Sequence, residues 1–363
     1  MTTMLLSQLT TAAVGGPAQE YVSASTEEEL ILALQKTDQD QQRLLVLGGG
    51  SNILVADAGF AGTVVHIKTQ GIRELADSSP ERTVLRVQAG HNWDDFVNYT
   101  LTRQLSGLEA LSGIPGTVGA TPLQNVGAYG AEVAHTICAV RSWDRQKQEI
   151  KNFEPAELQF SYRDSLLKQT MQAGSPRYVV LSVDFALAAG QLSAPIRYAE
   201  LARQLGVELG DRVEASRLRH KVLALRASKG MVLDPADRDT YSTGSFFTNP
   251  IVDRSKLASL PKDTPHYPVI DSQGQLLEQQ VKLSAAWLIQ EAGFDKGFGL
   301  EGNSLEIAGG RASLSTKHTL AISNRGDASC ADLLAIAKTV QEGVEHAFGV
   351  GLVPEPLILA DTQ

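Results

Sequence analysis

Two glycine-rich segments in the first half of the chain restrict its fold more than any other feature. The first, Gly48-Gly49-Gly50-Ser51-Asn52, separates short apolar runs at residues 44–47 and 53–55. The second spans residues 107–130 and combines glycines and prolines with scattered apolar side chains. Glycine adopts positive φ and lets other groups approach the backbone closely, so both segments predict sharp turns with a tightly fitting neighbour.

The first segment has two interpretations. Successive backbone N–H groups in such a turn can form a nest that binds a diphosphate or another anion. A tight turn between two strands explains the same glycines without any ligand. The segment lacks the GK[ST] ending of a P-loop, and it is not the GxGxxG of a strand-to-helix dinucleotide site.

The second segment is predicted to be ordered. Connections of this length are usually functional or disordered. Disorder conflicts with the apolar residues spread along it, which favour burial: Leu108, Leu111, Ile114, Val118, Leu123, Val126 and Tyr129. Glycine loops can also pack only against neighbouring backbone, but two of them in one half of the chain favour a bulky cofactor.

Composition excludes several classes of protein. The 363 residues carry a formal charge of −9, which argues against coating of nucleic acid or of an anionic membrane. The two cysteines and seven histidines show no metal-binding spacing. The first 16 residues lack a basic leader. We therefore expect a multidomain protein of the cytoplasm without a metal.

Several elements can be predicted from caps and apolar runs. Thr26 with Glu29 forms a capping box for a helix, and residues 178–189 form an apolar run that predicts a buried strand. After residue 228, Ser284 and Ser329 each begin a predicted helix. These helices alternate with strand-like residues 305–308 and 319–323, which indicates an α+β arrangement.

Five motifs occur in order along the chain and together match one family. They are LGGGSN at 47–52, IPG through QNVGAYG at 114–130, SYRDS at 161–165, GSFFTNP at 244–250 and PEP at 354–356. The chain resembles the UDP-N-acetylenolpyruvoylglucosamine reductases of peptidoglycan synthesis over nearly its whole length. Tyr198 resembles the mobile tyrosine of the longer subclass, although a tyrosine packed by an amphipathic helix would look similar.

The resemblance implies an α+β protein with an FAD-binding fold of the vanillyl-alcohol-oxidase (PCMH) type and a C-terminal substrate domain. The implied domains are 15–190 for FAD, 191–228 for a tyrosine-bearing insert and connecting helix, and 229–357 for the substrate. The implied FAD-binding residues are Gly48, Gly49, Gly50, Ser51, Asn52, Ile114, Pro115, Gly116, Thr117, Gly119, Ala120, Asn125, Gly127, Ala128, Tyr129 and Gly130.

The resemblance also implies the reaction. NADPH reduces FAD, and the flavin reduces UDP-N-acetylglucosamine enolpyruvate to UDP-N-acetylmuramate. Arg163 and Glu355 are implied to stabilise the enolate, and Ser245 to donate the proton to C2. Each residue also has a simpler interpretation. Arg163 could form a surface ion pair with Asp164, Glu355 could be an exposed loop carboxylate, and Ser245 could be a turn serine.

The implied substrate-binding residues are Gln124, Tyr162, Tyr198, Lys229 and Asn249. A solvated surface lysine is the alternative for Lys229. Thr248 replaces a basic residue that many members carry, which removes one phosphate contact. Residues 295–315 match loosely and receive no role. The family suggests a monomer that needs no nucleic acid, membrane or metal.

Two other functions remain open at this stage. A sugar or alcohol oxidase of the same fold is the nearest alternative, because fold alone does not determine chemistry. A regulatory protein that keeps FAD without turnover is the second. Slow oxygen consumption during NADPH oxidation would exclude the oxidase, and loss of function in Ser245→Ala would exclude the regulatory protein.

Overall fold

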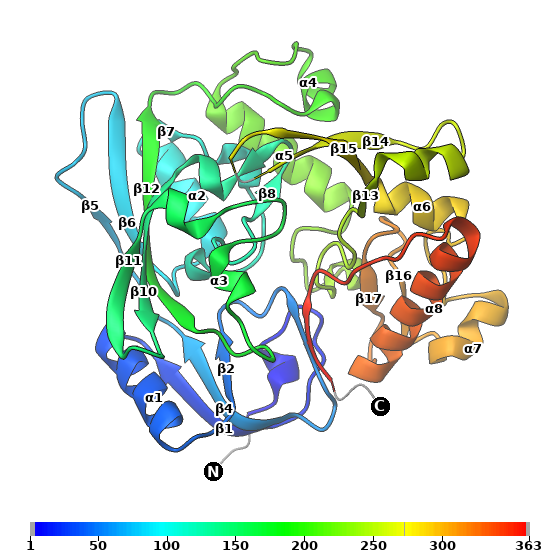
Figure 1. Cartoon of the computed structure of the whole chain (residues 1–363), viewed down its shortest axis with the longest axis horizontal. Helices are drawn as coiled ribbons and strands as arrows, with labels where there is room; N and C mark the ends of the chain where they lie inside the picture. Colours follow the sequence, from blue (N-terminus) through cyan, green and yellow to red (C-terminus); the bar gives the residue numbers. More distant parts are fainter. Residues whose placement is uncertain (1–3, 272, 361–363) are drawn as a thin grey trace. The chain divides into compact units, whose positions relative to one another are not determined.

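The structure is a computed structural model that describes residues 4–271 and 273–360. It divides into two compact units, each assembled from separate stretches of the chain (Figure 1). The N-terminal unit comprises Gln19–Gly49 and Ala61–Ser228. The C-terminal unit comprises Gly50–Phe60, the stretch from Lys229 onward and the residues up to Ala18. The boundary therefore passes through the first glycine segment.

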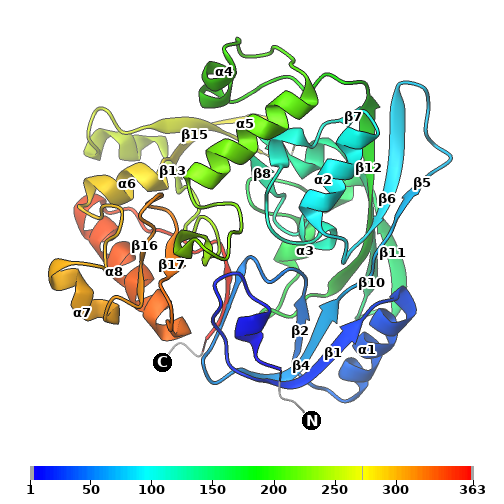
Figure 2. The ribbon, with the colours of Figure 1, turned by 180° about the vertical axis from the view of Figure 1, so that it is seen from behind.

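A small sheet and one helix begin the N-terminal unit. The strands run in the order β1 (Ala18–Ala24), β4 (Phe60–Ile67) and β2 (Leu44–Leu47), with β2 parallel to β4. Helix α1 (Glu27–Gln39) lies beside this sheet in both views (Figures 1 and 2). Its capping box is present, since the Thr26 hydroxyl accepts a hydrogen bond of 3.1 Å from the Glu29 N–H. This helix prediction is confirmed.

The apolar run at 178–189 is the central strand of a large antiparallel sheet. Strand β12 (Tyr178–Ala189) is buried along most of its length, as its sequence predicts. The sheet order is β11-β10-β12-β6-β5, and β7 pairs with the end of β12. The other strands are β5 (Ile72–Glu74), β6 (Arg82–Gln88), β7 (Leu105–Ser106), β10 (Ile137–Asp144) and β11 (Glu149–Phe153).

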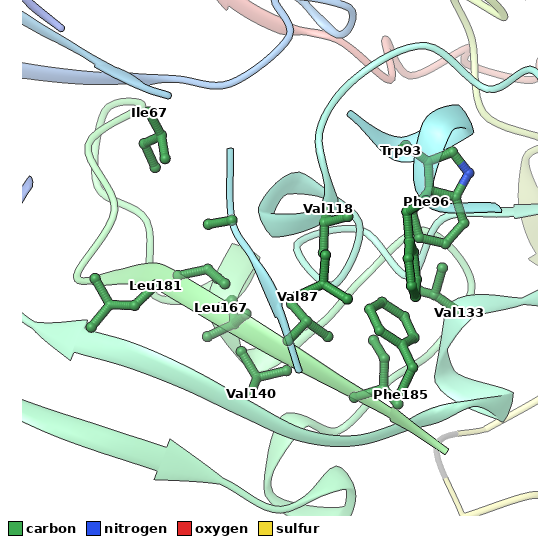
Figure 3. Packing of buried hydrophobic residues seen from close by; sticks show 14 of the residues in the cluster. Ile67, Val87, Trp93, Phe96, Val118, Val133, Val140, Leu167, Leu181 and Phe185 are labelled. Carbon is green, nitrogen blue, oxygen red and sulfur yellow. The ribbon is translucent and has the colours of Figure 1, made fainter. Parts of the chain in front are cut away.

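An aromatic cluster orders the second glycine segment (Figure 3). Trp93 and Phe96 of helix α2 (Trp93–Thr102) pack against Phe185 of β12, with ring centroids 6.0 and 5.0 Å apart, respectively. The Trp93 indole N–H donates to the Leu111 carbonyl at 2.9 Å. Each fully buried large side chain stabilises the fold by about 2–3 kcal/mol. Val118 joins the same core, so the segment is ordered as predicted.

The rest of the N-terminal unit consists of short elements and two helices. The short elements are β8 (Gly127–Ala128), β9 (Ala131–Glu132) and α3 (Leu166–Gln169). Helices α4 (Ala199–Leu205) and α5 (Ala215–Ser228) have a small core of their own, which includes Ile196 and Val222. Tyr198 lies at the N-cap of α4, directly before the first residue of the helix.

The C-terminal unit contains three small sheets. Strand β18 (Leu357–Leu359) pairs in parallel with β3 (Ile53–Val55). Because β3 pairs there, the first glycine segment is not a hairpin turn. The remaining strands are β13 (Ile251–Asp253), β14 (His266–Ile270) and β15 (Leu276–Leu283) in the order β13-β15-β14, and the antiparallel pair β16 (Ala312–Leu314) and β17 (Ile322–Asn324).

Two of the C-terminal helices agree with their predicted caps. Ser284 caps α6 (Ala285–Glu291), and Ser329 begins α8 (Cys330–Phe348) with a capping box. The prediction of a strand at 305–308 is wrong, because these residues form helix α7 (Leu305–Ala308), which packs on α8. A four-residue apolar run fits either type, and Gly309 in the left-handed region ends the helix.

Helices long and apolar enough to cross a lipid bilayer do not occur in the described part of the chain.

Candidate functional site

The two glycine segments meet backbone to backbone in the N-terminal unit. A Cβ atom on Gly49 would lie 2.6 Å from the Gly116 Cα, and one on Gly48 would lie 2.5 Å from the Thr117 Oγ1. Real Cβ atoms essentially never come that close. We call these four residues the glycine contact. Gly49 and the nearby Ala120 remain exposed, so the contact presents backbone to a ligand.

The second segment is positioned by the backbone before α2. Trp93 donates to Gly116, Val118 donates to His91, and Gly119 donates to Ala89, at 2.8–3.1 Å. A Cβ on Gly119 would lie 2.5 Å from that of Ala89. The glycines are therefore needed for packing as well as for exposed backbone. This is the arrangement that a flat, phosphorylated cofactor such as FAD requires.

His66 supports the first glycine segment, a role that no sequence motif indicated. Its Nδ1 is 2.8 Å from the Tyr21 hydroxyl, and its ring also hydrogen-bonds the Gly48 backbone carbonyl. Burial, assisted by the charge of Lys68, lowers the pKa of His66 to about 4. The ring is therefore neutral at physiological pH, with Nδ1 accepting from Tyr21 and Nε2 donating to Gly48.

An ion pair ties the second segment to α5. The Asp94 carboxylate accepts from the Gly113 N–H at 2.6 Å and pairs with both terminal nitrogens of Arg219 at 2.6 and 2.8 Å. Burial alone would raise the pKa of Asp94, but these hydrogen bonds and the Arg219 charge lower it. Asp94 is therefore ionised, and its hydrogen bond with the Gly113 N–H fixes the position of that part of the second glycine segment.

Asn125 organises the loop through its side chain. The amide donates to Glu132 at 2.7 Å and to the Ser161 carbonyl at 3.1 Å, and it accepts from the Ala134 N–H at 3.2 Å. Asn125 is buried and has a φ of +44°. These contacts give the side chain a positioning role within the protein.

Arg163 lies at the tip of a tight turn closed by two hydrogen bonds between Ser161 and Asp164. Its φ is +56°, a conformation that costs an arginine roughly 1–3 kcal/mol. One terminal nitrogen donates to the Gly127 carbonyl at 2.9 Å, and the guanidinium lies over the Tyr162 ring. The strained turn thus holds a cation beside the second glycine segment.

The end of that segment faces the tyrosine-bearing insert. Tyr129, with a φ of +51°, packs edge-to-face on Tyr198 with ring centroids 5.6 Å apart. A Cβ on Gly130 would lie 2.9 Å from that of Arg197. The predicted cofactor and substrate residues therefore come together here, within one unit.

Arg226 of α5 is a further cation that motif reasoning missed. Burial lowers the pKa of its guanidinium, and the positive Arg163 lowers it further, whereas Tyr129 and Asp94 raise it. Arg226 is thus close enough to three site residues to interact with them electrostatically. The only sequence signal was its place three residues before Lys229.

Ser245 and Glu355 come together in the C-terminal unit although 110 residues separate them. Phe246, next to Ser245, accepts a hydrogen bond of 2.8 Å from the Glu355 N–H, and Phe247 forms an antiparallel bridge with Pro354. Both residues are half-buried. Phe246 and Phe247 are fully buried and anchor the segment that carries Ser245.

The remaining predicted residues of the C-terminal unit have clear structural contacts. Asn52 donates to the Glu355 carbonyl at 3.3 Å and accepts from the Leu357 N–H at 3.0 Å. Gly50 has a φ of +60° and packs on Leu9. The Asn249 side chain accepts from the Ala285 N–H at the start of α6.

A basic cluster surrounds Lys229. Burial lowers the pKa of His318 to about 4, and the nearby charges of Lys229 and Lys296 lower it further. Two cations and a neutral imidazole therefore gather where a diphosphate is expected to bind. Lys296 lies in the stretch 295–315, to which the sequence assigned no role, and His318 lies just after it, so electrostatics adds these two residues to the candidate site.

Five further predicted residues lie in the two glycine segments. Ile114, Pro115 and Gln124 lie in the second segment and are half-buried, as is Ala128 in β8. Ser51 follows Gly50 in the C-terminal unit. Among the described residues, no group of acidic, histidine or cysteine side chains is arranged to hold a metal ion.

Comparison with known proteins extends this picture. An FAD binding domain model matches residues 18–151, and the model of the UDP-N-acetylenolpyruvoylglucosamine reductase C-terminal domain matches residues 234–359. The reductase of Thermobifida fusca is 48% identical over 98% of this chain and 97% of its own length, and that of Cutibacterium acnes is 47% identical over 98% and 89%. The crystal structure of the Thermus caldophilus reductase is 26% identical, covers 98% of both chains and has a TM-score of 0.63.

The FAD-binding fold and the exposed glycine contact define this protein as an FAD-dependent oxidoreductase, with a second, C-terminal domain. The predicted α+β fold of the vanillyl-alcohol-oxidase type is confirmed. The chain belongs to the UDP-N-acetylenolpyruvoylglucosamine reductase family, as the five motifs indicated. It is therefore an enzyme of peptidoglycan precursor synthesis.

Proposed function

We propose that the enzyme reduces UDP-N-acetylglucosamine enolpyruvate to UDP-N-acetylmuramate with NADPH as the reductant. The observation that supports the proposal is the backbone bridge between Phe247 and Pro354, with the Glu355 N–H donating to the Phe246 carbonyl, which brings the segments that carry Ser245 and Glu355 together from distant parts of the chain. An oxidase would not require a proton donor for an enolate, so this pairing favours the reductase.

In this proposal the FAD is held mainly by residues 48–52 and 114–130, within the predicted domain 15–190. Gly48, Gly49 and Gly116 allow close approach of the flavin nucleotide, and Tyr129 borders it. FAD held there would supply hydride, taken from NADPH, for reduction at C3 of the enolpyruvyl group.

Ser245 donates the proton that completes the reduction at C2. Hydride addition at C3 leaves C2 with enolate character, and this basic carbon can take a proton from a well-placed hydroxyl. Phe246 and Phe247 are fully buried and restrict the movement of the neighbouring Ser245. The Ser245 hydroxyl therefore loses little conformational freedom when the substrate binds. Glu355 assists by hydrogen-bonding the enol form of the substrate carboxyl group.

Arg163 stabilises the negative charge that grows on the substrate carboxylate. A guanidinium offers two parallel N–H donors, which match a carboxylate. Its turn already has the strained conformation, so little reorganisation is required when charge develops. The hydrogen bond to Gly127 fixes one side of the guanidinium and orients the rest.

Lys229 pairs with the substrate diphosphate, supported by Lys296 and His318. Tyr198, in the predicted insert 191–228, covers the diphosphate, and Gln124, Tyr162 and Asn249 complete the contacts. Residues 229–357 form the substrate domain. We propose a monomeric enzyme of the cytoplasm.

An absorbance spectrum followed by anaerobic titration tests the proposal. The purified protein is expected to be yellow, to lose its visible flavin absorbance with NADPH, and to regain it when the enolpyruvyl sugar nucleotide is added. A protein that is reoxidised only by oxygen would be an oxidase. A protein that binds FAD but is not reduced by NADPH would be neither enzyme.

A further inference from the structure

A cavity of about 240 Å³ lies within the N-terminal unit, beside the tyrosine-bearing insert. One part of its wall comes from residues 106–110 and 129–136, and another from residues 194–201 and Arg212. Tyr129 and Gly130 border it, but no residue of the glycine contact does, and neither does Arg163. The cavity therefore contains none of the three residues proposed to be catalytic, although two residues of the predicted FAD-binding set border it.

Two hydrogen-bond donors face each other at this cavity. The His135 Nδ1 accepts from the Glu132 N–H at 3.2 Å, so in the neutral ring the proton resides on Nε2. That Nε2 is 3.4 Å from a terminal nitrogen of Arg197, which can only donate. Burial lowers the pKa of His135, and the Arg197 charge lowers it further. An acceptor placed between the two groups would satisfy both donors.

The charge at the cavity is also positive. Within the described residues, neither Arg197 nor Arg212 forms an ion pair with a carboxylate, and Arg212 donates only to the Ser193 carbonyl. The one acidic residue of the wall, Glu109, already accepts from the Gly107 and Ala194 N–H groups at 2.6 and 2.5 Å. The cavity wall thus carries two positive side chains and one carboxylate that is already hydrogen-bonded. This local positive charge is opposite in sign to the net charge of −9 of the whole protein.

Apart from Ser106 and Thr136, the rest of the wall is mostly apolar. It includes Ala110, Ala186, Ile196, Leu201 and Leu218. The volume is below the range of about 300–1,000 Å³ for sites of drug-sized ligands. An inorganic ion would leave much of this surface without a partner, whereas a ligand with a small apolar body would cover it.

We infer that this cavity binds a small organic anion, with a phosphate or carboxylate group between His135 and Arg197 and an apolar body against the alanine and leucine wall. Because the wall joins the insert to the second glycine segment, the bound anion links these two parts of the N-terminal unit. Arg212 supplies the second positive charge.

Calorimetry on the FAD-loaded full-length enzyme tests the inference with three probes: phenyl phosphate, inorganic phosphate and phenol. Phenyl phosphate is expected to bind about tenfold more tightly than inorganic phosphate, because it also covers the apolar wall. Phenol is expected to show no measurable binding, because it lacks the charge. Equal affinity for phenol and phenyl phosphate would contradict an anion site.

The matched variants are the double variant Arg197→Ala with Arg212→Ala, and Arg203→Ala on α4 as a control, since Arg203 does not line the cavity. The double variant is expected to weaken phenyl phosphate binding at least tenfold, and the control less than about twofold. Equal losses in both would overturn the inference. So would binding that disappears when uridine diphosphate is present at saturation, since it would then belong to the proposed substrate site.

Discussion

At the scale of single residues, the site depends on positions where close neighbours or an unusual backbone conformation restrict the residue type. Gly49 faces Gly116 so closely that any Cβ must displace backbone. Arg163 retains a left-handed conformation that is costly for its residue type. The strain at Arg163 is tolerated because two hydrogen bonds between Ser161 and Asp164 close its turn. Such positions mark where structure serves binding rather than stability alone.

Gly49→Ala is expected to weaken FAD binding at least tenfold. The new methyl group would be 2.6 Å from the Gly116 Cα, and relieving this overlap costs about 1–3 kcal/mol. Flavin fluorescence during titration of the apoprotein measures the dissociation constant. Gly351→Ala is the matched control, because it has open space around it. Equal affinities in the two variants would show that the glycine contact does not shape the flavin site.

Arg163→Lys is expected to lower kcat about 100-fold with little change in KM. Lysine keeps the charge but loses the paired donors that match a carboxylate whose negative charge grows during the reaction. Steady-state kinetics with the sugar nucleotide measures both constants. A rise in KM at unchanged kcat would instead assign Arg163 to substrate binding.

At the scale of elements, caps and long apolar runs predicted well. Thr26, Ser284 and Ser329 begin helices as expected, and β12 has the bounds of its apolar run. Local rules succeed there because the signal lies within one turn or one strand. They fail at Leu305–Ala308, where packing on α8 decides between helix and strand.

His66 supports the first glycine segment because two strands pack side by side. No sequence motif indicates this contact. His66 meets Gly48 because β4 pairs in parallel with β2, and this pairing joins residues far apart in sequence. His66→Ala is expected to weaken FAD binding several-fold, because the Gly48 carbonyl and the Tyr21 hydroxyl both lose a partner. His66→Gln, which can accept and donate, is expected to restore it. Failure of glutamine to restore affinity would point to ring packing instead.

At the scale of the whole molecule, buried neutral histidines make stability depend on pH. The pKa of His66 is about 4 in the folded protein, against 6.5 ordinarily. Above pH 6.5 both states are neutral. As the pH falls from 6.5 toward 4, the unfolded chain binds a proton that the folded protein does not, so stability is lost.

When the pH is lowered from 7 to 5, the unfolding free energy of the His66→Gln variant is therefore expected to fall by about 2 kcal/mol less than that of the wild type. This difference corresponds to about 1.36 kcal/mol for each pH unit below 6.5. Urea denaturation at fixed FAD concentration measures the difference. His318 remains in both proteins and cancels in the comparison. Identical pH profiles would mean that His66 titrates normally in the folded state.

The sequence motifs anticipated the family, but local patterns did not reveal that each compact unit is assembled from separate stretches of the chain. Residues Ala12 and Val14 are buried in the core of the C-terminal unit, as is Leu54 of β3. Such discontinuous packing leaves no local pattern, because each short stretch resembles an ordinary apolar run. The cations Arg226 and Lys296 were missed for the same reason, since their importance comes from neighbours that folding brings near.

The most direct test of the proposed chemistry is a single turnover with enzyme whose flavin has been reduced without oxygen. After mixing with UDP-N-acetylglucosamine enolpyruvate, flavin absorbance is expected to return rapidly in the wild type. In Ser245→Ala it is expected to return at least about 100-fold more slowly, because the proton donor to C2 is gone. Flavin content should be equal in both proteins. Equal rates of flavin reoxidation would contradict the account.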